Sequence, residues 1–138
     1  MKATIFVDTS AWYALVDASD ANHPRASAFL TKALAHYREM ATTNHVIGES
    51  YTLVRLRLGH AVAAEFLRNV QKAHRLKHIF VSEDMEQEAY KFLERLPDQP
   101  LSFVDGTSCV AMTQHGITDC FAFDNGFISA GFTVLPNA

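Results

Sequence analysis

The sequence predicts an α/β domain with a central parallel sheet of about five strands flanked by helices. Short apolar runs alternate along the chain with longer stretches of helical periodicity, an order typical of parallel sheets. The apolar runs are continuous rather than alternating, as expected of strands that are covered on both faces. The length of 138 residues, with 49% hydrophobic and 20% charged residues, fits a single globular domain over residues 1–138.

The first part of the chain gives two strands and four helices. In order, we expect a strand over 3–7, a helix over 9–17, a helix that begins near Asn22 and continues to Tyr37, a strand over 40–43, and helices over 44–58 and 60–74. Pro24 suits a first helical turn, where its missing N–H is not needed. Gly59 suits a position just beyond a helix end.

The second part gives three more strands and two helices. In order, we expect a strand over 79–81, a helix that begins at Ser82 and is closed by Pro97, a helix over 102–115, and strands over 121–123 and 133–135. No internal repeat or linker interrupts the alternation, so a second domain is not expected.

Several functional classes are disfavoured by composition. Cys109 and Cys120 are the only cysteines, and we expect reduced core thiols in a cytoplasmic protein rather than a disulfide framework. We expect neither a signal peptide nor a membrane span. His45 and Glu49 lack the second histidine of a zinc protease motif. The net charge of −3 argues against broad binding to nucleic acid, but not against an acidic site that binds cations.

Four acidic residues occupy positions that suggest chemistry. Asp8 and Asp124 each follow an apolar strand directly, while Glu49 and Asp105 lie early in helices with apolar stripes. The carboxyl ends of parallel strands meet at one crevice, so we expect the four side chains to converge there. Converging carboxylates repel one another, and Mg²⁺ or Mn²⁺ would relieve that repulsion.

Each acid also has a purely local explanation. Asp8 fits a helix N-cap, and Asp105 forms an acidic capping box with Ser102. Asp124 precedes Asn-Gly, where a turn is expected. Glu49 shares a helical stripe with Val46, Leu53 and Leu56, and the local explanation for it is an edge position that reaches water.

The order and spacing of these residues resemble those of PIN-domain ribonucleases, and most of all the VapC toxins of toxin–antitoxin pairs. The segments that carry the resemblance are Asp8-Thr9-Ser10, Glu49, Ser102-Phe-Val-Asp105, Phe123-Asp124-Asn-Gly-Phe127 and the closing Ala130–Leu135. The resemblance extends from Ile5 to Leu135 and implies a three-layer PIN-like fold. One departure is Gly126, because many relatives carry His or Asp two places after the last acid.

The resemblance further implies metal-dependent hydrolysis of RNA phosphodiester bonds. Asp8, Asp105 and Asp124 are then the expected metal ligands, and Glu49 is either a ligand or the base that orients water. Thr9, Ser10 and Thr107 are expected to support these groups. It also implies a homodimer and a small antitoxin partner, and an inhibitor would reach the acids through an Arg. The first helix is apolar on more than one face and needs cover, which either the second helix or a partner surface would supply. Its apolar residues are Trp12, Tyr13, Leu15 and Val16.

Other classes remain as alternatives. A haloacid-dehalogenase-like phosphatase also places an Asp after the first strand, but it needs a second acid where this chain has Ser10. A receiver domain needs a Lys after a late strand, and none follows Phe123. A non-catalytic interaction module on a PIN scaffold is the remaining alternative, and loss of an acid would mark it.

Overall fold

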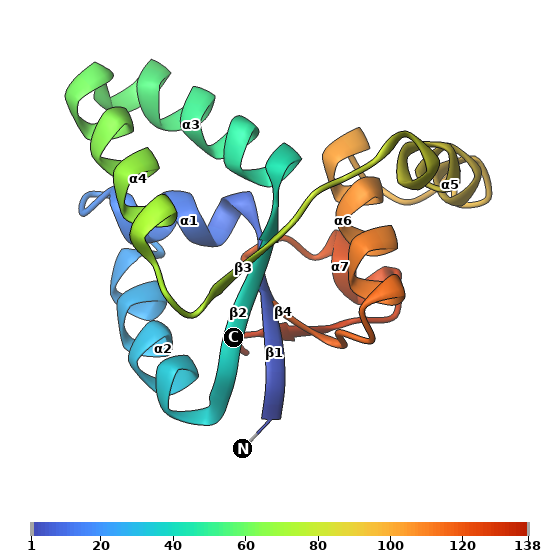
Figure 1. Ribbon diagram of the computed structural model, residues 1–138, viewed down its shortest axis with the longest axis horizontal. Coiled ribbons are helices and arrows are strands. Elements are labelled where there is room, and N and C mark those ends of the chain that lie inside the picture. The colour runs from blue at the N-terminus through green and yellow to red at the C-terminus, as the bar shows by residue number, and fades with distance from the viewer. Residues whose placement is uncertain (1, 138) are drawn as a thin grey trace.

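The computed structural model describes residues 2–137 (Figure 1). Its elements in chain order are β1 (Lys2–Val7), α1 (Thr9–Val16), α2 (His23–His36), β2 (Tyr37–Thr43), α3 (Asn44–Leu58), α4 (His60–Lys72), β3 (Leu76–Ile79), α5 (Glu83–Glu94), α6 (Phe103–Gln114), β4 (Asp119–Phe121), α7 (Gly126–Ser129) and β5 (Thr133–Leu135). None of the helices over residues 2–137 combines the length and the apolar character that a membrane crossing requires.

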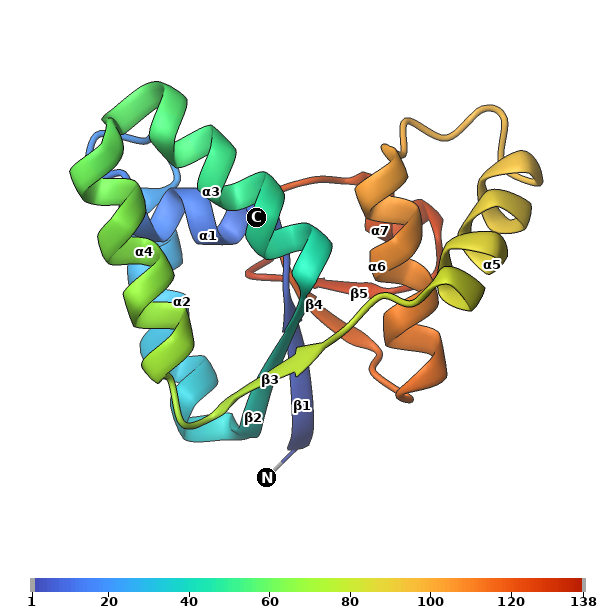
Figure 2. The ribbon, with the colours of Figure 1, turned by 45° about the horizontal axis from the view of Figure 1, so that its top comes forward.

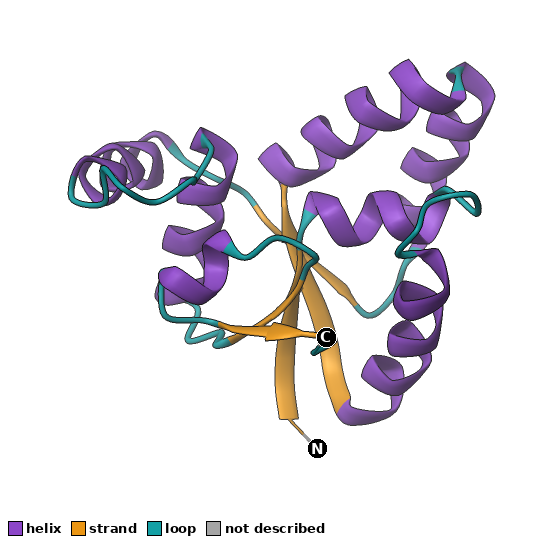
Figure 3. Ribbon diagram, turned by 180° about the vertical axis from the view of Figure 1, so that it is seen from behind, coloured by secondary structure: helices purple, strands orange, loops and turns teal. Residues whose placement is uncertain are grey.

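The strands form a five-stranded sheet in the order β3-β2-β1-β4-β5, and all its pairings are parallel. Helices α1 to α4 gather on one side of this sheet and α5 to α7 on the other (Figure 3). This confirms the predicted three-layer α/β fold. The chain builds outward from β1 in both directions, so the order reverses between β1 and β4. Open α/β sheets bind ligands at such a switch point.

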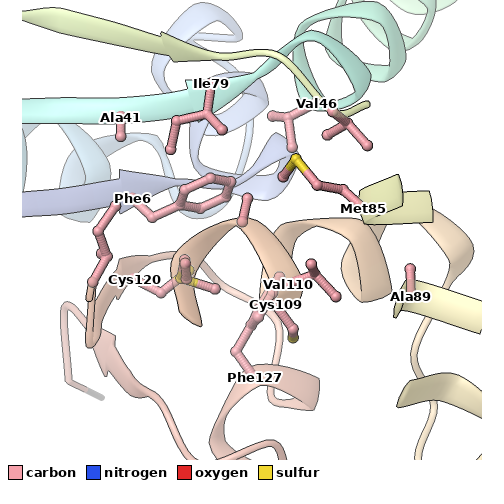
Figure 4. Close-up of a cluster of buried hydrophobic side chains, with 14 of the residues drawn as sticks. Phe6, Ala41, Val46, Ile79, Met85, Ala89, Cys109, Val110, Cys120 and Phe127 are labelled. Atoms are coloured by element: carbon pink, nitrogen blue, oxygen red, sulfur yellow. The ribbon is translucent and has the colours of Figure 1, made fainter. Parts of the chain in front are cut away.

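Both faces of the sheet are buried, which explains the continuous apolar runs. On the α6 side, Phe6 packs with Cys109, Cys120 and Phe127 (Figure 4). The opposite face includes Ile5 and packs against α1 and α2. Cys109 and Cys120 are free and buried, as expected of core thiols.

Two predicted strand boundaries were wrong because tertiary contacts decide them. Tyr37 was expected to end the second helix, but it begins β2, where its buried hydroxyl donates to Asp119 at 2.5 Å. The third strand was expected over 79–81 but covers Leu76–Ile79. Arg75 explains this earlier start, because its guanidinium donates to the carbonyl oxygens of Tyr37 and Arg38 and holds β3 beside β2.

The last part of the chain also differs from the prediction. The fourth strand was expected over 121–123, but β4 ends at Phe121, whose carbonyl accepts the backbone N–H of Asp8 at 3.0 Å. Beyond that point, Phe123 donates its N–H to the Ser10 hydroxyl instead of to a strand. A short helix, α7, follows Asn125 where only a turn was expected. The ends of β1 and β4 are therefore fastened together beside Asp8.

Candidate functional site

Asp8 lies at the carboxyl end of β1 and is 3% exposed. It caps α1, since its Oδ2 accepts the Ser10 backbone N–H at 3.1 Å and the Ser10 hydroxyl at 2.7 Å. The expected N-cap is thus present, but it uses only one carboxylate oxygen. The other oxygen, Oδ1, is buried and has no hydrogen-bond partner in the described chain. A buried unpaired carboxylate oxygen is costly, and the capping contacts do not account for it.

Asp105 follows the same pattern in the first turn of α6. Its Oδ2 accepts the Ser102 backbone N–H at 3.0 Å, and the Ser102 hydroxyl accepts the Asp105 N–H at 3.0 Å. The predicted capping box is therefore confirmed. Because the capping box engages Oδ2 alone, Oδ1 remains available on a side chain whose residue is 7% exposed.

Asp124 is half-buried between β4 and α7. Its Oδ1 accepts the Gly126 backbone N–H at 2.9 Å, which is the expected turn contact. A side chain at Gly126 would bring its Cβ to 2.9 Å from Leu101 Cδ2. Many relatives carry His or Asp at this position. Gly126 suits this chain because Leu101 fills the space that a larger residue would occupy.

Glu49 is half-buried on α3 and faces an open hollow of about 620 Å³ between α3 and α6. Figure 2 shows these two helices on either side of this end of the sheet. Thr9 and Val104 line the same hollow. The expected stripe of Val46, Glu49, Leu53 and Leu56 is only partly inward, because Leu56 is 79% exposed. The predicted edge position that reaches water is the better description of Glu49.

The acids influence one another electrostatically. Burial, assisted by the charge of Asp105 and opposed by the Ser10 hydrogen bonds, raises the pKa of Asp8 from 3.8 to about 6. Burial also raises the pKa of Asp105, with the charges of Asp124 and Glu49 acting in the same direction. Asp105 is thus the electrostatic centre of a group that contains all four predicted acids.

The side chains do not form a closed coordination cage. No three His, Cys, Asp or Glu side chains within residues 2–137 lie close enough together to hold one ion as they stand. A site of one or two carboxylates completed by water molecules is, however, the usual way in which proteins hold Mg²⁺. The acidic group fits that description better than it fits an all-protein cage.

The three predicted supporting residues differ in what they contact. Ser10 bridges Asp8 and the Phe123 backbone. The Thr9 hydroxyl is buried and has no partner among residues 2–137. Thr107 donates its hydroxyl to the Val104 carbonyl at 2.8 Å, within its own helix, rather than to one of the acids.

His45 also lies at the site, and the sequence did not reveal which residue it contacts. Its Nε2 lies 3.3 Å from the Glu86 carboxylate, which comes from α5. The partners are far apart in sequence, so no spacing rule could have paired them. The imidazole therefore has a carboxylate partner at the rim of the hollow.

Residues 5–132 match the PIN domain family, and the chain belongs to that family. It is 42% identical over 130 residues to VapC20 of Mycobacterium tuberculosis, described as a 23S rRNA-specific endonuclease, with 93% of this chain and 95% of the relative covered. The crystal structure of M. tuberculosis VapC20, described as a Sarcin-Ricin loop cleaving toxin, superimposes with a TM-score of 0.87. That match has 36% identity and covers 94% of this chain and 96% of the other.

More distant structures share the fold alone. VapBC2 from Rickettsia felis, solved with a DNA fragment, has a TM-score of 0.69 at 13% identity and covers 95% of this chain and 96% of the other. FitAcB from Neisseria gonorrhoeae has a TM-score of 0.66 at 14% identity and covers 96% of each chain. The resemblance to PIN domains and VapC toxins is thus confirmed.

Proposed function

We propose that residues 1–138 form one nuclease domain, a divalent-metal-dependent endoribonuclease that acts in the cytoplasm as the toxin of a toxin–antitoxin pair. The observation that carries this proposal is the unpaired, buried Oδ1 of Asp8 beside Asp105. This oxygen supports a cation site. The likeness to a 23S rRNA endonuclease, 42% identical with 93% of this chain covered, supports RNA as the substrate. The non-catalytic alternative is less well supported, because it gives no reason to keep this oxygen buried and unpaired.

The donor set fits a hard divalent cation. All four acids offer oxygen, the ligand that Mg²⁺ and Mn²⁺ prefer. Asp8, Asp105 and Asp124 would hold one or two ions between them with water molecules completing the coordination, since each uses one oxygen for the backbone and leaves the other without a hydrogen bond inside the described chain. Glu49, which faces the open hollow, would add a ligand or act as the base.

A bound Mg²⁺ or Mn²⁺ would supply Lewis acidity at a phosphoryl oxygen and lower the pKa of a water molecule. The chain's own residues then have separate tasks. If Glu49 is the base rather than a ligand, its carboxylate oxygen would accept the proton of the attacking water. Ser10 keeps Asp8 Oδ2 turned toward the helix, so that Oδ1 faces the site. Thr107 steadies the start of α6 through its hydrogen bond to the Val104 carbonyl, and the Thr9 hydroxyl, which has no partner among residues 2–137, would hydrogen-bond to a water molecule or ligand at the site.

The proposed substrate is the Sarcin–Ricin loop of 23S rRNA. This choice rests on VapC20, whose crystal structure superimposes over 94% of this chain with a TM-score of 0.87. The net charge of −3 supports selection of one RNA structure over general attraction to phosphates.

The proposed assembly is a homodimer inhibited by a small antitoxin. Trp12, Leu15 and Val16 of α1 line an apolar hollow of about 590 Å³ together with residues of α2 and α4. Tyr13 is instead buried against α3 and α4. The neighbouring helices therefore cover only part of the apolar surface of α1, and a partner would cover the rest. An antitoxin Arg that reaches Asp8 and Asp105 would compete with the metal.

The direct test is cleavage of purified ribosomal RNA with Mg²⁺, Mn²⁺ or chelator, followed by mapping of the new ends. We expect one dominant cut in 23S rRNA with either ion and none with chelator. The Asp8→Asn protein, prepared identically, is the control for contaminating nuclease. Absence of cleavage under every condition would favour the interaction module instead.

The assembly is tested separately. Light scattering should give twice the monomer mass. Expression alone should arrest growth, and coexpression of a neighbouring small gene should restore it unless that partner's Arg is removed. Harmless expression of a monomeric protein would contradict the toxin assignment without affecting the nuclease assignment.

A further inference from the structure

Three aromatic rings form a surface row that the proposed reaction leaves unexplained. Tyr90 of α5 and Phe103 of α6 have ring centroids 5.6 Å apart, and His45 of α3 lies 6.0 Å from Phe103 on centroids. Tyr90 is 50% exposed and Phe103 is 39% exposed. The row thus brings three helices together at the surface.

The row borders the acidic site. Phe103 is the first residue of α6, two positions before Asp105, and His45 lies one helical turn before Glu49. His45 and Glu49 line the same hollow between α3 and α6. The contact of His45 Nε2 with the Glu86 carboxylate of α5, at 3.3 Å, holds the imidazole in place. A ligand whose reacting phosphate lies at the acids would therefore have its neighbouring groups beside these rings.

The ring geometry differs from that of the aromatic pairs nearer the core. The Tyr90–Phe103 and His45–Phe103 pairs are inclined by only 34° and 38°. Trp12 and Phe66 meet edge to face, with 71° between their planes. Edge-to-face pairs fill a core, whereas exposed rings whose faces are closer to parallel can accept another flat ring by stacking.

The surrounding charge selects the kind of ligand. The first turn of α5 carries Glu83, Asp84 and Glu86, so the rim beside the row repels phosphates. Nucleobases are flat and uncharged, and single-stranded loops offer them unstacked to aromatic side chains. The bases of an RNA loop, rather than its backbone, match this surface.

We propose that Tyr90, Phe103 and His45 form a stacking platform that binds unpaired bases next to the scissile phosphate of the RNA. This inference rests on the proposed ribonuclease function and adds specificity-determining residues to it. Stacking on the platform holds the loop open at the acids, and so contributes to substrate binding rather than to the chemical step.

The test compares Phe103→Leu and Tyr90→Leu with the wild-type protein. Leucine keeps apolar bulk and helix propensity but removes the aromatic face. The substrate is an RNA hairpin that carries the Sarcin–Ricin loop of 23S rRNA. We expect KM to rise about tenfold in each variant, in line with the loss of one base–aromatic stack, while kcat stays within about twofold. Phe103→Trp should restore the wild-type KM.

Phe80→Leu is the matched control, because Phe80 is 75% exposed and lines a hollow with residues of α3 and α4 that is distinct from the hollow of His45 and Glu49. Its KM should equal that of the wild type. A second readout uses the same hairpin with 2-aminopurine at single loop positions and chelator present. The wild type should quench the fluorescence at one or two positions, and the two Leu variants should not.

Several outcomes would overturn the platform. Unchanged KM and quenching in both Leu variants would do so, as would a lower kcat and melting midpoint at constant KM, which indicates a structural role. An equal loss in Phe80→Leu would indicate general apolar contact, and unchanged RNA binding with lost antitoxin binding would assign the row to a protein partner. If Phe103→Leu fails to fold, Tyr90→Leu decides alone. A wild type that neither binds nor cleaves RNA contradicts the proposed function itself.

Discussion

Asp119 and Asp8 are both buried carboxylates, at the amino and carboxyl ends of the same sheet. Asp119 is 5% exposed and accepts hydrogen bonds from Tyr37 at 2.5 Å, Lys2 at 2.9 Å and Thr118 at 3.3 Å. Burial alone would raise its pKa, but these three partners hold the pKa below 3.8. Asp8 is as deeply buried, yet its Oδ1 has no partner among the described residues and its pKa rises to about 6.

On the proposed function, the difference separates a carboxylate that stabilises the fold from one that binds a cation. Complete hydrogen bonding makes the ionised Asp119 favourable in the folded state. The unpaired oxygen of Asp8 makes ionisation there unfavourable until a cation arrives. The two aspartates should therefore respond in opposite ways to substitution, pH and metal ions.

The largest expected effect is on catalysis. Asp8→Asn should lower the rate of RNA cleavage at least about a thousandfold, a loss of about 4 kcal/mol of transition-state stabilisation. Asn keeps the N-cap, so the helix should persist. Single-turnover cleavage of 23S rRNA measures the effect, with circular dichroism as the check on folding. Wild-type rates in this variant would remove Asp8 from the site, and Asp105→Asn should behave in the same way.

The pH dependence of stability should carry the signature of Asp8. Its folded pKa of about 6 lies above the ordinary 3.8, so ionisation destabilises the folded, metal-free protein. Asp8 therefore contributes about 3 kcal/mol to the free energy of unfolding below about pH 4, and this contribution is lost as pH rises through about 6. Denaturant unfolding in chelator at pH 5 and pH 7 measures the part that falls in this range, about 1 kcal/mol.

Asp8→Asn again provides the reference for that experiment. The stability gain between pH 7 and pH 5 should shrink in this variant, while Asp119 contributes nothing over this range because its pKa lies lower still. An equal pH dependence in wild type and variant would show that Asp8 is not the group that titrates.

Asp119→Asn should have the reverse phenotype. The substitution removes a charge-assisted network with Tyr37 and Lys2 at the base of β1, β2 and β4, and should cost about 2 kcal/mol of stability. Because the site lies at the other end of the sheet, kcat and KM on RNA should stay at wild-type values under conditions where the variant is folded. A loss of activity that exceeds the unfolded fraction would contradict this separation.

The smallest effect belongs to Lys2→Met. The Lys2 side chain is 68% exposed, so solvent and salt screen its ion pair with Asp119. The expected cost is about 0.5 kcal/mol, and it should fade at high ionic strength. A cost as large as that of Asp119→Asn would mean that Lys2, rather than the buried Tyr37 hydroxyl, satisfies the carboxylate.

Much of the fold could be predicted because its signals are local. The apolar run at 3–7 became a central strand, and Pro24 and Gly59 marked helix ends as expected. For the acids, the local and the functional explanations turned out to be compatible. Asp8 and Asp105 do cap helices, and the capping contacts engage only one oxygen of each. The sequence could predict capping and metal binding for each aspartate, but it could not show which carboxylate oxygen serves which role.

The remaining features depend on contacts between distant segments. The local sequence places Tyr37 at the end of a helix. Its actual place in β2 depends on Asp119, 82 residues later, which accepts the hydrogen bond of its hydroxyl. The partnership of His45 with Glu86 and Phe103 likewise needs three helices to be in place. Asp119 was not singled out at all, because a lone acid at the start of a strand carries no pattern.

Calorimetric titration with Mn²⁺ tests the central claim most directly, because it measures the cation site without any RNA. Wild-type protein and Asp119→Asn should bind Mn²⁺ with similar affinity and enthalpy, and Asp8→Asn should bind at least about tenfold more weakly. No Mn²⁺ binding by the wild type at millimolar ion, or equal binding by Asp8→Asn, would contradict the account.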